Sequence, residues 1–168
     1  RNGNTFNGNA FVDITFLKDF KFTFNVGTTV NEIRYYTTTN PYYGFGAEQN
    51  GTVTMYHYRT TTLNLQQILN YSHNFGKHNI SVMLGHESYK YNYAELSASK
   101  KNMFSYWGNH ELNGAVIDGS SAASYSNDYN TEGYFFRALY DYDAKYYFSA
   151  SYRRDASSVF HPDYRWGN

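Results

Sequence analysis

Cysteine is absent from this chain of 168 residues, and only two prolines occur. Without cysteine, neither a disulfide framework nor a thiolate-bound metal site can form. No run of 18 or more apolar residues is present, which excludes a membrane-spanning helix. Positive and negative charges balance to a formal net charge of zero, so the charge gives no reason to expect nucleic acid as a partner. These absences exclude a disulfide-stabilised domain, a helical membrane protein and a basic nucleic-acid-binding domain.

Aromatic residues, by contrast, are abundant. They make up 21% of the chain, with 20 tyrosines and 13 phenylalanines, whereas charged residues make up 17%. Tyrosine suits a half-buried pleated surface, and it also suits a membrane–water interface, where the ring is buried and the hydroxyl stays hydrated. The mean hydropathy of -0.70 is low, but a membrane β-barrel dilutes its apolar signal with a polar, lumen-facing half. The composition therefore favours an all-β chain and is compatible with a membrane barrel.

Strict alternation of side-chain character marks two strands in the last third of the chain, over residues 134–142 and 146–152. The odd positions of this stretch include Arg137, Asp141 and Arg153. Period-two alternation predicts strands whose two faces see different surroundings. A hairpin with an apolar outer face and a charged inner face is what a membrane barrel requires. The even positions carry the apolar and aromatic residues: Tyr134, Phe136, Ala138, Tyr140, Tyr142, Tyr146, Phe148, Ala150 and Tyr152.

Four further strands are predicted, so that the chain has about six. Alternation is imperfect at residues 63–69, where an amphipathic helix is the alternative. Connections that alternate between short and long are typical of outer-membrane barrels, with short periplasmic turns and long extracellular loops. The predicted fold is an antiparallel transmembrane β-barrel segment. The added strands cover residues 9–17, 20–30, 52–71 and 80–93; short turns are expected at 18–19, 74–79 and 143–145, long irregular loops at 37–51 and 94–127, and an open polar exit from Asp155.

The segment from Tyr140 to Gly167 resembles the barrel of the SusC-like family, the TonB-dependent outer-membrane transporters of Bacteroidetes. Its most specific part is an Arg-Arg-Asp run followed by two serines and an Arg-Trp-Gly; Ala156 departs from the glycine that is usual in the family. The segments FNGNAFVDITFLKDFKF, NPYYGFG and GHESYKYNYAELSASKK are also similar to the family, so the resemblance covers nearly the whole chain. The motif residues are Arg153, Arg154, Asp155, Ser157, Ser158, Phe160, Pro162, Arg165, Trp166 and Gly167.

The resemblance implies active import of a nutrient across the outer membrane. It implies a barrel of roughly 22 strands filled by a plug domain, energy from the TonB complex, and a SusD-like surface lipoprotein as a lid. Oligosaccharides are the first expected substrate and peptides the second. The chain starts at Arg1 without a signal peptide. We therefore expect residues 1–168 to be part of the barrel domain, without the plug, and we expect no enzymatic chemistry and no cofactor.

Two groups of residues are candidates for functional contacts. Asp13, Arg137, Asp141 and Arg153 are expected to line a polar lumen, where they either shape the path of a substrate or form ion pairs that hold the wall against the plug. Tyr42, Tyr43, Tyr106 and Trp107 lie in the predicted loops and are candidates for contact with a substrate or the lid. For the tyrosines we favour an interfacial girdle or loop packing. For Trp107 we favour contact with the ligand or the lid.

The remaining patterns carry little chemistry. Six histidines are scattered without the spacing of a metal site. A soluble antiparallel β-sandwich that binds carbohydrate is the alternative from another class, and a β-rich surface adhesin is a third hypothesis. A sandwich would fill its apolar positions mainly with valine, isoleucine and leucine. Tyrosines at the strand ends and alternating connection lengths favour the barrel and outer-membrane lipid as its surroundings.

Overall fold

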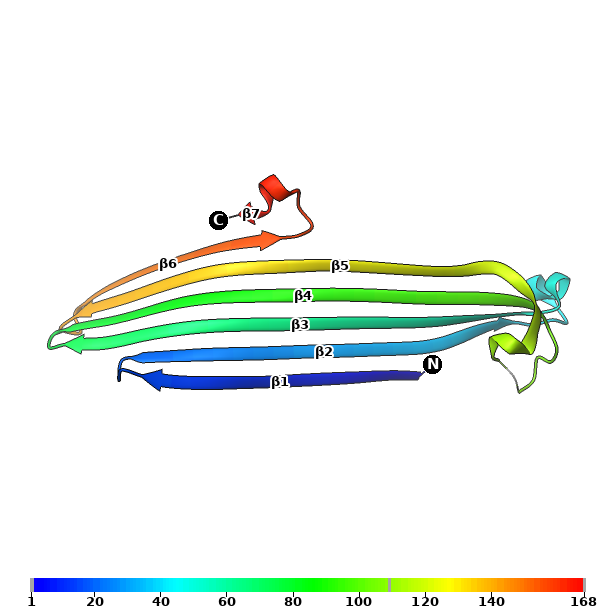
Figure 1. The fold of residues 1–168 in the computed structure, drawn as a ribbon, viewed down its shortest axis with the longest axis horizontal. Coiled ribbons are helices and arrows are strands. Elements are labelled where there is room, and N and C mark those ends of the chain that lie inside the picture. Colours follow the sequence, from blue (N-terminus) through cyan, green and yellow to red (C-terminus); the bar gives the residue numbers. More distant parts are fainter. Residues whose placement is uncertain (1, 109, 168) are drawn as a thin grey trace. The chain divides into compact units, whose positions relative to one another are not determined.

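The computed structural model describes residues 2–108 and 110–167, and it is all-β. Neighbouring strands are hydrogen-bonded in an antiparallel sheet whose spatial order follows the chain, from β1 to β7 (Figure 1). Three short 3-10 helices lie in the connections, and none of the helices in the described residues is long or apolar enough to cross a membrane. The strands are β1 (Asn2–Phe16), β2 (Phe20–Thr39), β3 (Thr52–Phe75), β4 (His78–Met103), β5 (Ala115–Tyr142), β6 (Tyr146–Ser157) and β7 (Trp166–Gly167); the helices are η1 (Gly44–Gln49), η2 (Leu112–Gly114) and η3 (Pro162–Tyr164).

The six predicted strands are confirmed as β1–β6, but most of them are longer than the sequence indicated. The predicted irregular segment over residues 94–127 is wrong at both ends, because β4 continues to Met103 and β5 begins at Ala115, which leaves a loop over residues 104–114. Tyrosine and valine in this stretch, as at Tyr125 and Val116, are residue types that strands favour. With polar residues on both faces, however, the stretch shows no apolar alternation to detect. The alternative helix at residues 63–69 is excluded, since these residues lie inside β3.

Three tight turns join the strands in hairpins. In the turn between β5 and β6, Asp143 and Ala144 both have positive φ, and the amide of Lys145 donates to the carbonyl of Tyr142. Two central residues with positive φ give the type I′ geometry that matches the twist of a hairpin. The turn between β3 and β4 has Gly76 at φ 69°, where glycine carries no steric cost. The turn geometry therefore fixes the register of each hairpin.

Ionic contacts hold these turns to their neighbours. Asp143 lies 3.3 Å from the Lys77 ammonium and 2.9 Å from that of Lys145, so one carboxylate bridges two turns. Asp19, at the first turn, lies 2.8 Å from Nδ1 of His73. The backbone amide of Asp143 also donates to the carbonyl of Lys77. The ends of adjacent hairpins are thereby fixed to one another.

The chain divides into two compact units, and β1–β5 contribute residues to both. Unit 1 consists of the described residues of Arg1–Phe6, Val30–Thr61 and Asn92–Asn127, and it contains both long loops. Unit 2 consists of Asn7–Thr29, Thr62–Tyr91 and Asp128–Asn168, again within the described part, and it contains the three tight turns. The buried hydrophobic residues are a small cluster in unit 1, Val53, Met103 and Ala115. Unit 2 has no fully buried apolar side chain among its described residues, so its apolar side chains lie on a surface.

Candidate functional site

One face of unit 2 is apolar. The register of β5 and β6 places Phe136 opposite Tyr152, Ala138 opposite Ala150 and Tyr140 opposite Phe148. Directly opposed residues in an antiparallel pair share a face. The same face extends over neighbouring strands, where a shallow depression of about 430 Å³ is lined mainly by apolar residues. These include Phe22, Leu69, Leu84, Phe136 and Tyr152.

Aromatic rings border this face near the tight turns. Phe20 stacks on Phe16 with ring centroids 5.4 Å apart and contacts Tyr71 at 4.8 Å. Farther along the sheet, the ring of His78 lies 4.9 Å from that of Tyr142, and its Nδ1 is 2.7 Å from the hydroxyl of Tyr140. Rings that are apolar in body and polar at one tip are the side chains that settle at a membrane–water interface.

A polar cluster borders the same face at its other side. His86 lies between Gln67, at 2.6 Å from Nδ1, and Glu132, at 3.1 Å from Nε2. The hydroxyl of Tyr134 donates to Glu132 at 2.8 Å, and the Tyr134 ring stacks on Trp166. From His78 to His86 the strand rises about 26 Å, or roughly 20 Å in height at the usual barrel tilt. This height is close to the apolar band of about 25 Å that membrane barrels present to lipid.

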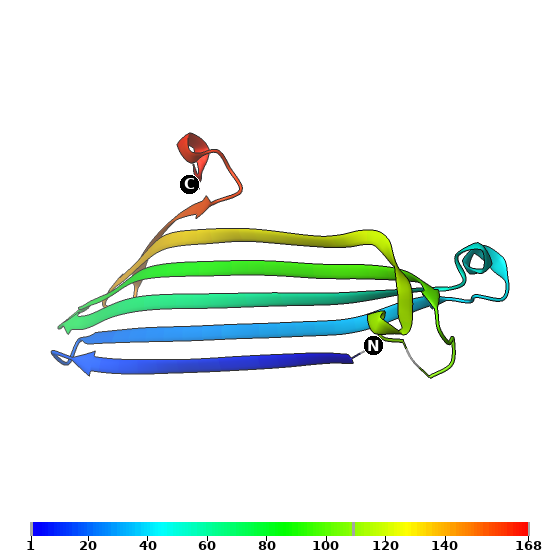
Figure 2. The same cartoon turned by 45° about the vertical axis from the view of Figure 1, so that its right-hand side comes forward.

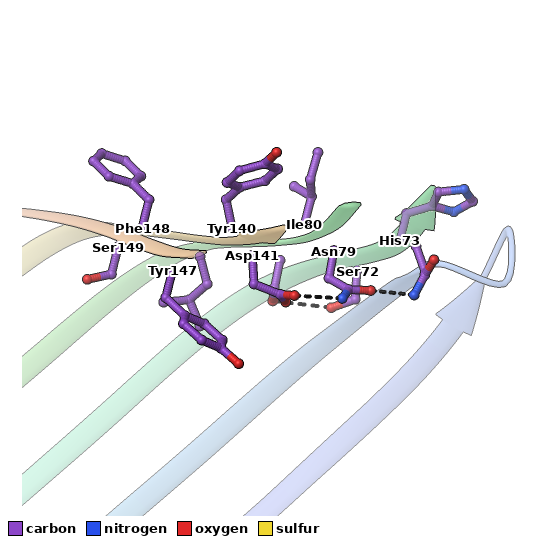
Figure 3. Close-up of a pocket in the computed structure, with 12 residues that line it drawn as sticks. Ser72, His73, Asn79, Ile80, Tyr140, Asp141, Tyr147, Phe148 and Ser149 are labelled. Atoms are coloured by element: carbon purple, nitrogen blue, oxygen red, sulfur yellow. Dashed lines mark hydrogen bonds between the residues drawn. The ribbon is translucent and has the colours of Figure 1, made fainter. Parts of the chain in front are cut away.

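Near the tight turns the other face of unit 2 carries polar side chains, as Figure 3 shows: Ser72, Asn79, Asp141 and Ser149 point to one side of the sheet together with the Tyr147 ring, and Tyr140, Ile80 and Phe148 point to the other. Asn79 donates to the carboxylate of Asp141 at 2.9 Å and accepts a hydrogen bond from Asn74. These residues line a depression of about 550 Å³. The chain of amides and a carboxylate could hydrogen-bond to a polar surface placed against it.

The structure places the predicted lumen charges as follows. Arg137, Asp141 and Arg153 share one face of the β5–β6 pair, opposite Ser151, Tyr147 and Phe135 respectively. Asp13 lies 2.9 Å from the ammonium of Lys21 and accepts a hydrogen bond from Thr23 at 2.6 Å. Arg153 lies 2.8 Å from Asp155 and 3.6 Å from Glu87, with its guanidinium 5.7 Å from the centroid of the Phe135 ring. Asp13 and Arg153 therefore make ionic contacts with other residues of the same sheet.

The segment from Asp155 to Gly167 does not form the open polar exit that the sequence predicted. β6 continues to Ser157, and the chain then folds back so that Trp166 pairs with Ala156 and Gly167 with Asp155 (Figure 2). Ala156 thus lies in a paired strand rather than in a turn.

Side-chain and backbone contacts fix this fold-back. The guanidinium of Arg154 lies 5.4 Å from the Trp166 ring, Arg165 donates to the carbonyl of Phe160, and the amide of Ser158 donates to the carbonyl of Asn130. Ser157 also accepts from the backbone amide of Val159. The residues that carry the family resemblance therefore build a local structure at the end of β6.

The four aromatic residues that the sequence placed in loops differ in how far their side chains are exposed. Tyr106 is half-buried and packs against the cluster of Val53, Met103 and Ala115, in line with the favoured loop packing. Trp107 is 76% exposed and touches Tyr106 only edge-on, at 5.3 Å. Tyr42 and Tyr43 are 71% and 72% exposed. Three of the four candidates thus present their rings to solvent in the long loops.

Sequence reasoning missed a row of five tyrosines in unit 1, which we call the tyrosine ladder: Tyr35, Tyr56, Tyr58, Tyr93 and Tyr125. Their ring centroids follow one another across β2–β5 at 4.7 Å (Tyr35 to Tyr56), 5.7 Å (Tyr35 to Tyr58), 6.2 Å (Tyr58 to Tyr93) and 6.2 Å (Tyr93 to Tyr125). The only sequence signal was the spacing of two residues between Tyr56 and Tyr58. Neighbouring strands had to be placed in register before the row could be seen.

Hydrogen bonds tie the ladder together. The hydroxyl oxygens of Tyr35 and Tyr58 are 2.7 Å apart. That hydrogen bond is the main cause of the raised pKa of Tyr58, which is about 12, and partial burial is the second cause. Tyr93 donates to Glu95 at 2.9 Å. Within the described residues, no group of three metal-binding side chains comes together here or elsewhere.

No protein-family model and no curated protein sequence matches the chain. Solved structures do match. A structure of the RagAB peptide transporter superimposes with a TM-score of 0.87 at 23% identity, covering 98% of this chain and 19% of that chain. The RagAB peptide importer matches in its "closed-closed" state with a TM-score of 0.87 at 23% identity, and in its "open-open" state with 0.84 at 24%. Both of these matches cover 98% of this chain and 18% of the importer chain.

The chain thus spans about a fifth of the length of the transporter chains that it matches. At this level of identity the likeness establishes the fold alone. The all-β sheet of this chain is therefore similar in fold to one segment of the RagAB transporter chain.

Proposed function

We propose that residues 1–168 are a wall segment of the barrel domain of a SusC-like, TonB-dependent outer-membrane transporter. The observation that carries the proposal is the bordered apolar face of unit 2, with aromatic rings near the tight turns and the His86 cluster at the other side. Its estimated height fits a lipid bilayer. The resemblance in sequence and the similarity to the RagAB transporter chain both support it.

In this proposal the residues of unit 2 cross the outer membrane. The tight turns face the periplasm, and the long loops of unit 1 lie outside the cell. A strand needs only about 9–11 residues to cross a bilayer. β3 has 24 residues, β4 has 26 and β5 has 28, so much of each strand lies beyond the lipid.

The polar face of unit 2 then faces the lumen. Asp13, Arg137, Asp141 and Arg153 are wall residues that meet the plug or the substrate path, and Asn79 holds Asp141 in position. The exposed rings of Tyr42, Tyr43 and Trp107 meet a substrate or a SusD-like lipoprotein lid. The plug and the contact with the TonB complex belong to other parts of the protein. The transporter performs no covalent chemistry.

Oligosaccharides are the proposed cargo, and peptides are the second candidate. The sequence resemblance supports the first candidate, and the likeness to a peptide transporter supports the second. Against the soluble β-sandwich, the described residues form one sheet, and no second sheet covers its apolar face.

The test is uptake by cells that carry the full-length gene. Labelled neutral oligosaccharides and labelled peptides are supplied in turn, with and without a functional TonB complex. We expect uptake of one class that is lost when either the gene or the TonB complex is removed. Uptake that persists without TonB would contradict the proposal, and the class that enters distinguishes the two cargoes.

A further inference from the structure

The tyrosine ladder of unit 1 forms a continuous aromatic surface that the loops do not cover. Tyr125 is 59% exposed, while Tyr35, Tyr58 and Tyr93 are half-buried against their neighbours on the sheet. Ring contacts join them across four strands. Cross-strand aromatic pairs contribute only about 0.2–1 kcal/mol each to a sheet. So small a contribution to stability does not account for five rings in one row. The row therefore points to an additional role.

The chemistry around the ladder is almost uncharged. A shallow depression of about 370 Å³ lies over it, lined by Asn31, Ile33, Tyr58, Thr60, Tyr93 and Glu95. Glu95 is the one ionisable carboxylate or amine among the described residues of this lining, and it accepts a hydrogen bond from Tyr93. Thr54 donates to Ser99 nearby. The surface thus offers aromatic rings, hydroxyls and an amide.

The ladder residues of β4 and β5 occupy odd-numbered positions, as the polar residues of these strands in unit 2 do. Tyr93 and Tyr125 are odd-numbered residues of β4 and β5, as are Asn79 on β4 and Asp141 on β5. In the proposed transporter, the odd positions of these strands face the lumen. The ladder would then be part of the inner wall on the extracellular side.

We infer that the tyrosine ladder is a binding surface for a linear, uncharged oligosaccharide entering the transporter. The aliphatic C–H groups of a sugar ring pack on the negative face of an aromatic ring, and the sugar hydroxyls can pair with the tyrosine, threonine and asparagine groups. A peptide would bring an anionic carboxyl terminus, for which the described residues of this lining offer no complementary cation. This inference rests on the proposed function.

The experiment uses the full-length protein purified in detergent. The probes are neutral hexasaccharides of glucose, mannose, xylose and fructose, with hexagalacturonate as an anionic counterpart and a pool of hexapeptides. We expect one neutral hexasaccharide to bind by calorimetry. Tyr58→Ala and Tyr93→Ala should each weaken that binding by about tenfold, the size of a moderate hot-spot effect. Tyr58→Phe, which keeps the ring, should weaken it less.

Tyr36→Ala is the matched control, because Tyr36 lies in the same unit, outside the ladder, and stacks on His110. It should leave the affinity unchanged. Heat stability on a gel shows whether each variant is folded. The inference is overturned if no neutral hexasaccharide binds, if only hexagalacturonate or the peptides bind, or if folded ladder variants bind as tightly as the wild type. Uptake that depends on TonB, with peptides as the only ligands, would overturn this inference and leave the transporter proposal intact.

Discussion

The two units share the same strands but distribute polarity differently over the two faces of the sheet. β4 shows the difference most clearly, because it runs through both units. Within unit 2, the even positions Ile80, Val82 and Leu84 are apolar, whereas the odd positions Asn79 and Ser81 are polar. Each face of the strand is therefore suited to a different medium in this unit.

Within unit 1, the same strand loses this contrast. Polar and charged residues occur at even positions, as at Asn92 and Lys100, and also at odd positions, as at Glu95 and Ser97. Residues of this kind on both faces are suited to water on both sides of the sheet. In the proposed transporter, the place where the alternation fades is the place where the strand leaves the lipid. The pattern of polar and apolar residues along a single strand can thus indicate two different surroundings.

The comparison predicts an all-or-none difference in accessibility. The chain has no cysteine, so an introduced cysteine is the only one within these 168 residues, and the unsubstituted full-length protein serves as the background control. In the full-length protein, Ala94→Cys in unit 1 should react with a membrane-impermeant maleimide on intact cells. Ala144→Cys in the turn between β5 and β6 should react only after the outer membrane is opened. Labelling of Ala144→Cys on intact cells would reverse the assignment of the two units.

A charge on the apolar face should have the next largest effect. Ala138 lies opposite Ala150 in unit 2, so Ala138→Arg would place a cation in lipid at a cost of about 2–4 kcal/mol. We expect a clear fall in the amount of heat-resistant barrel in outer membranes. Ala94→Arg, on an exposed position of unit 1, is the matched control and should assemble normally. Equal assembly of both variants would contradict the difference in surroundings.

Close packing on the polar face of unit 2 gives a smaller effect. A Cβ added to Gly85 would lie 2.0 Å from the ring of Phe135, so glycine is required for this close approach of ring and strand. Gly85→Val should destabilise the barrel by about 1–3 kcal/mol, the usual cost of overpacking. Urea unfolding in detergent measures the loss. Phe135→Leu should restore part of it, and Gly3→Val, where the nearest atoms are 3.6 Å away, should cost little.

The smallest predicted effect is a dependence of the stability of unit 1 on pH. The pKa of Tyr58 is raised to about 12, chiefly by its hydrogen bond with Tyr35. A raised pKa means that the folded state favours the neutral phenol, so the stabilisation is present below about pH 10 and is lost as the pH rises through 12. Carbon-13 NMR of labelled tyrosine should show Tyr58 among the last to ionise. Tyr35→Phe should lower its pKa, and an unchanged titration in this variant would contradict the assigned cause.

The sequence predicted the parts of the fold in which the two faces differ in polarity. The hairpin of residues 134–152 has faces of different polarity, and its even-numbered residues share one face as expected. The outer halves of β4 and β5 were missed, because a strand with polar residues on both faces resembles a polar loop. The fold-back of Trp166 onto β6 was also missed, since two residues of strand carry no periodicity. The tyrosine ladder depends on pairing between strands far apart in sequence, which no single stretch of residues reveals.

The strand order of the sheet has a further consequence for how such a wall is built. Every long strand pairs with the strands adjacent to it in the chain, so no pairing waits for a distant segment. Contacts between sequence neighbours have a low entropic cost of closure and favour fast folding. Each hairpin is then a self-contained module with its own turn. Adding or removing one hairpin would change the circumference of a barrel without changing the pairing of the other strands. Small and large pores can therefore be built from the same hairpin unit.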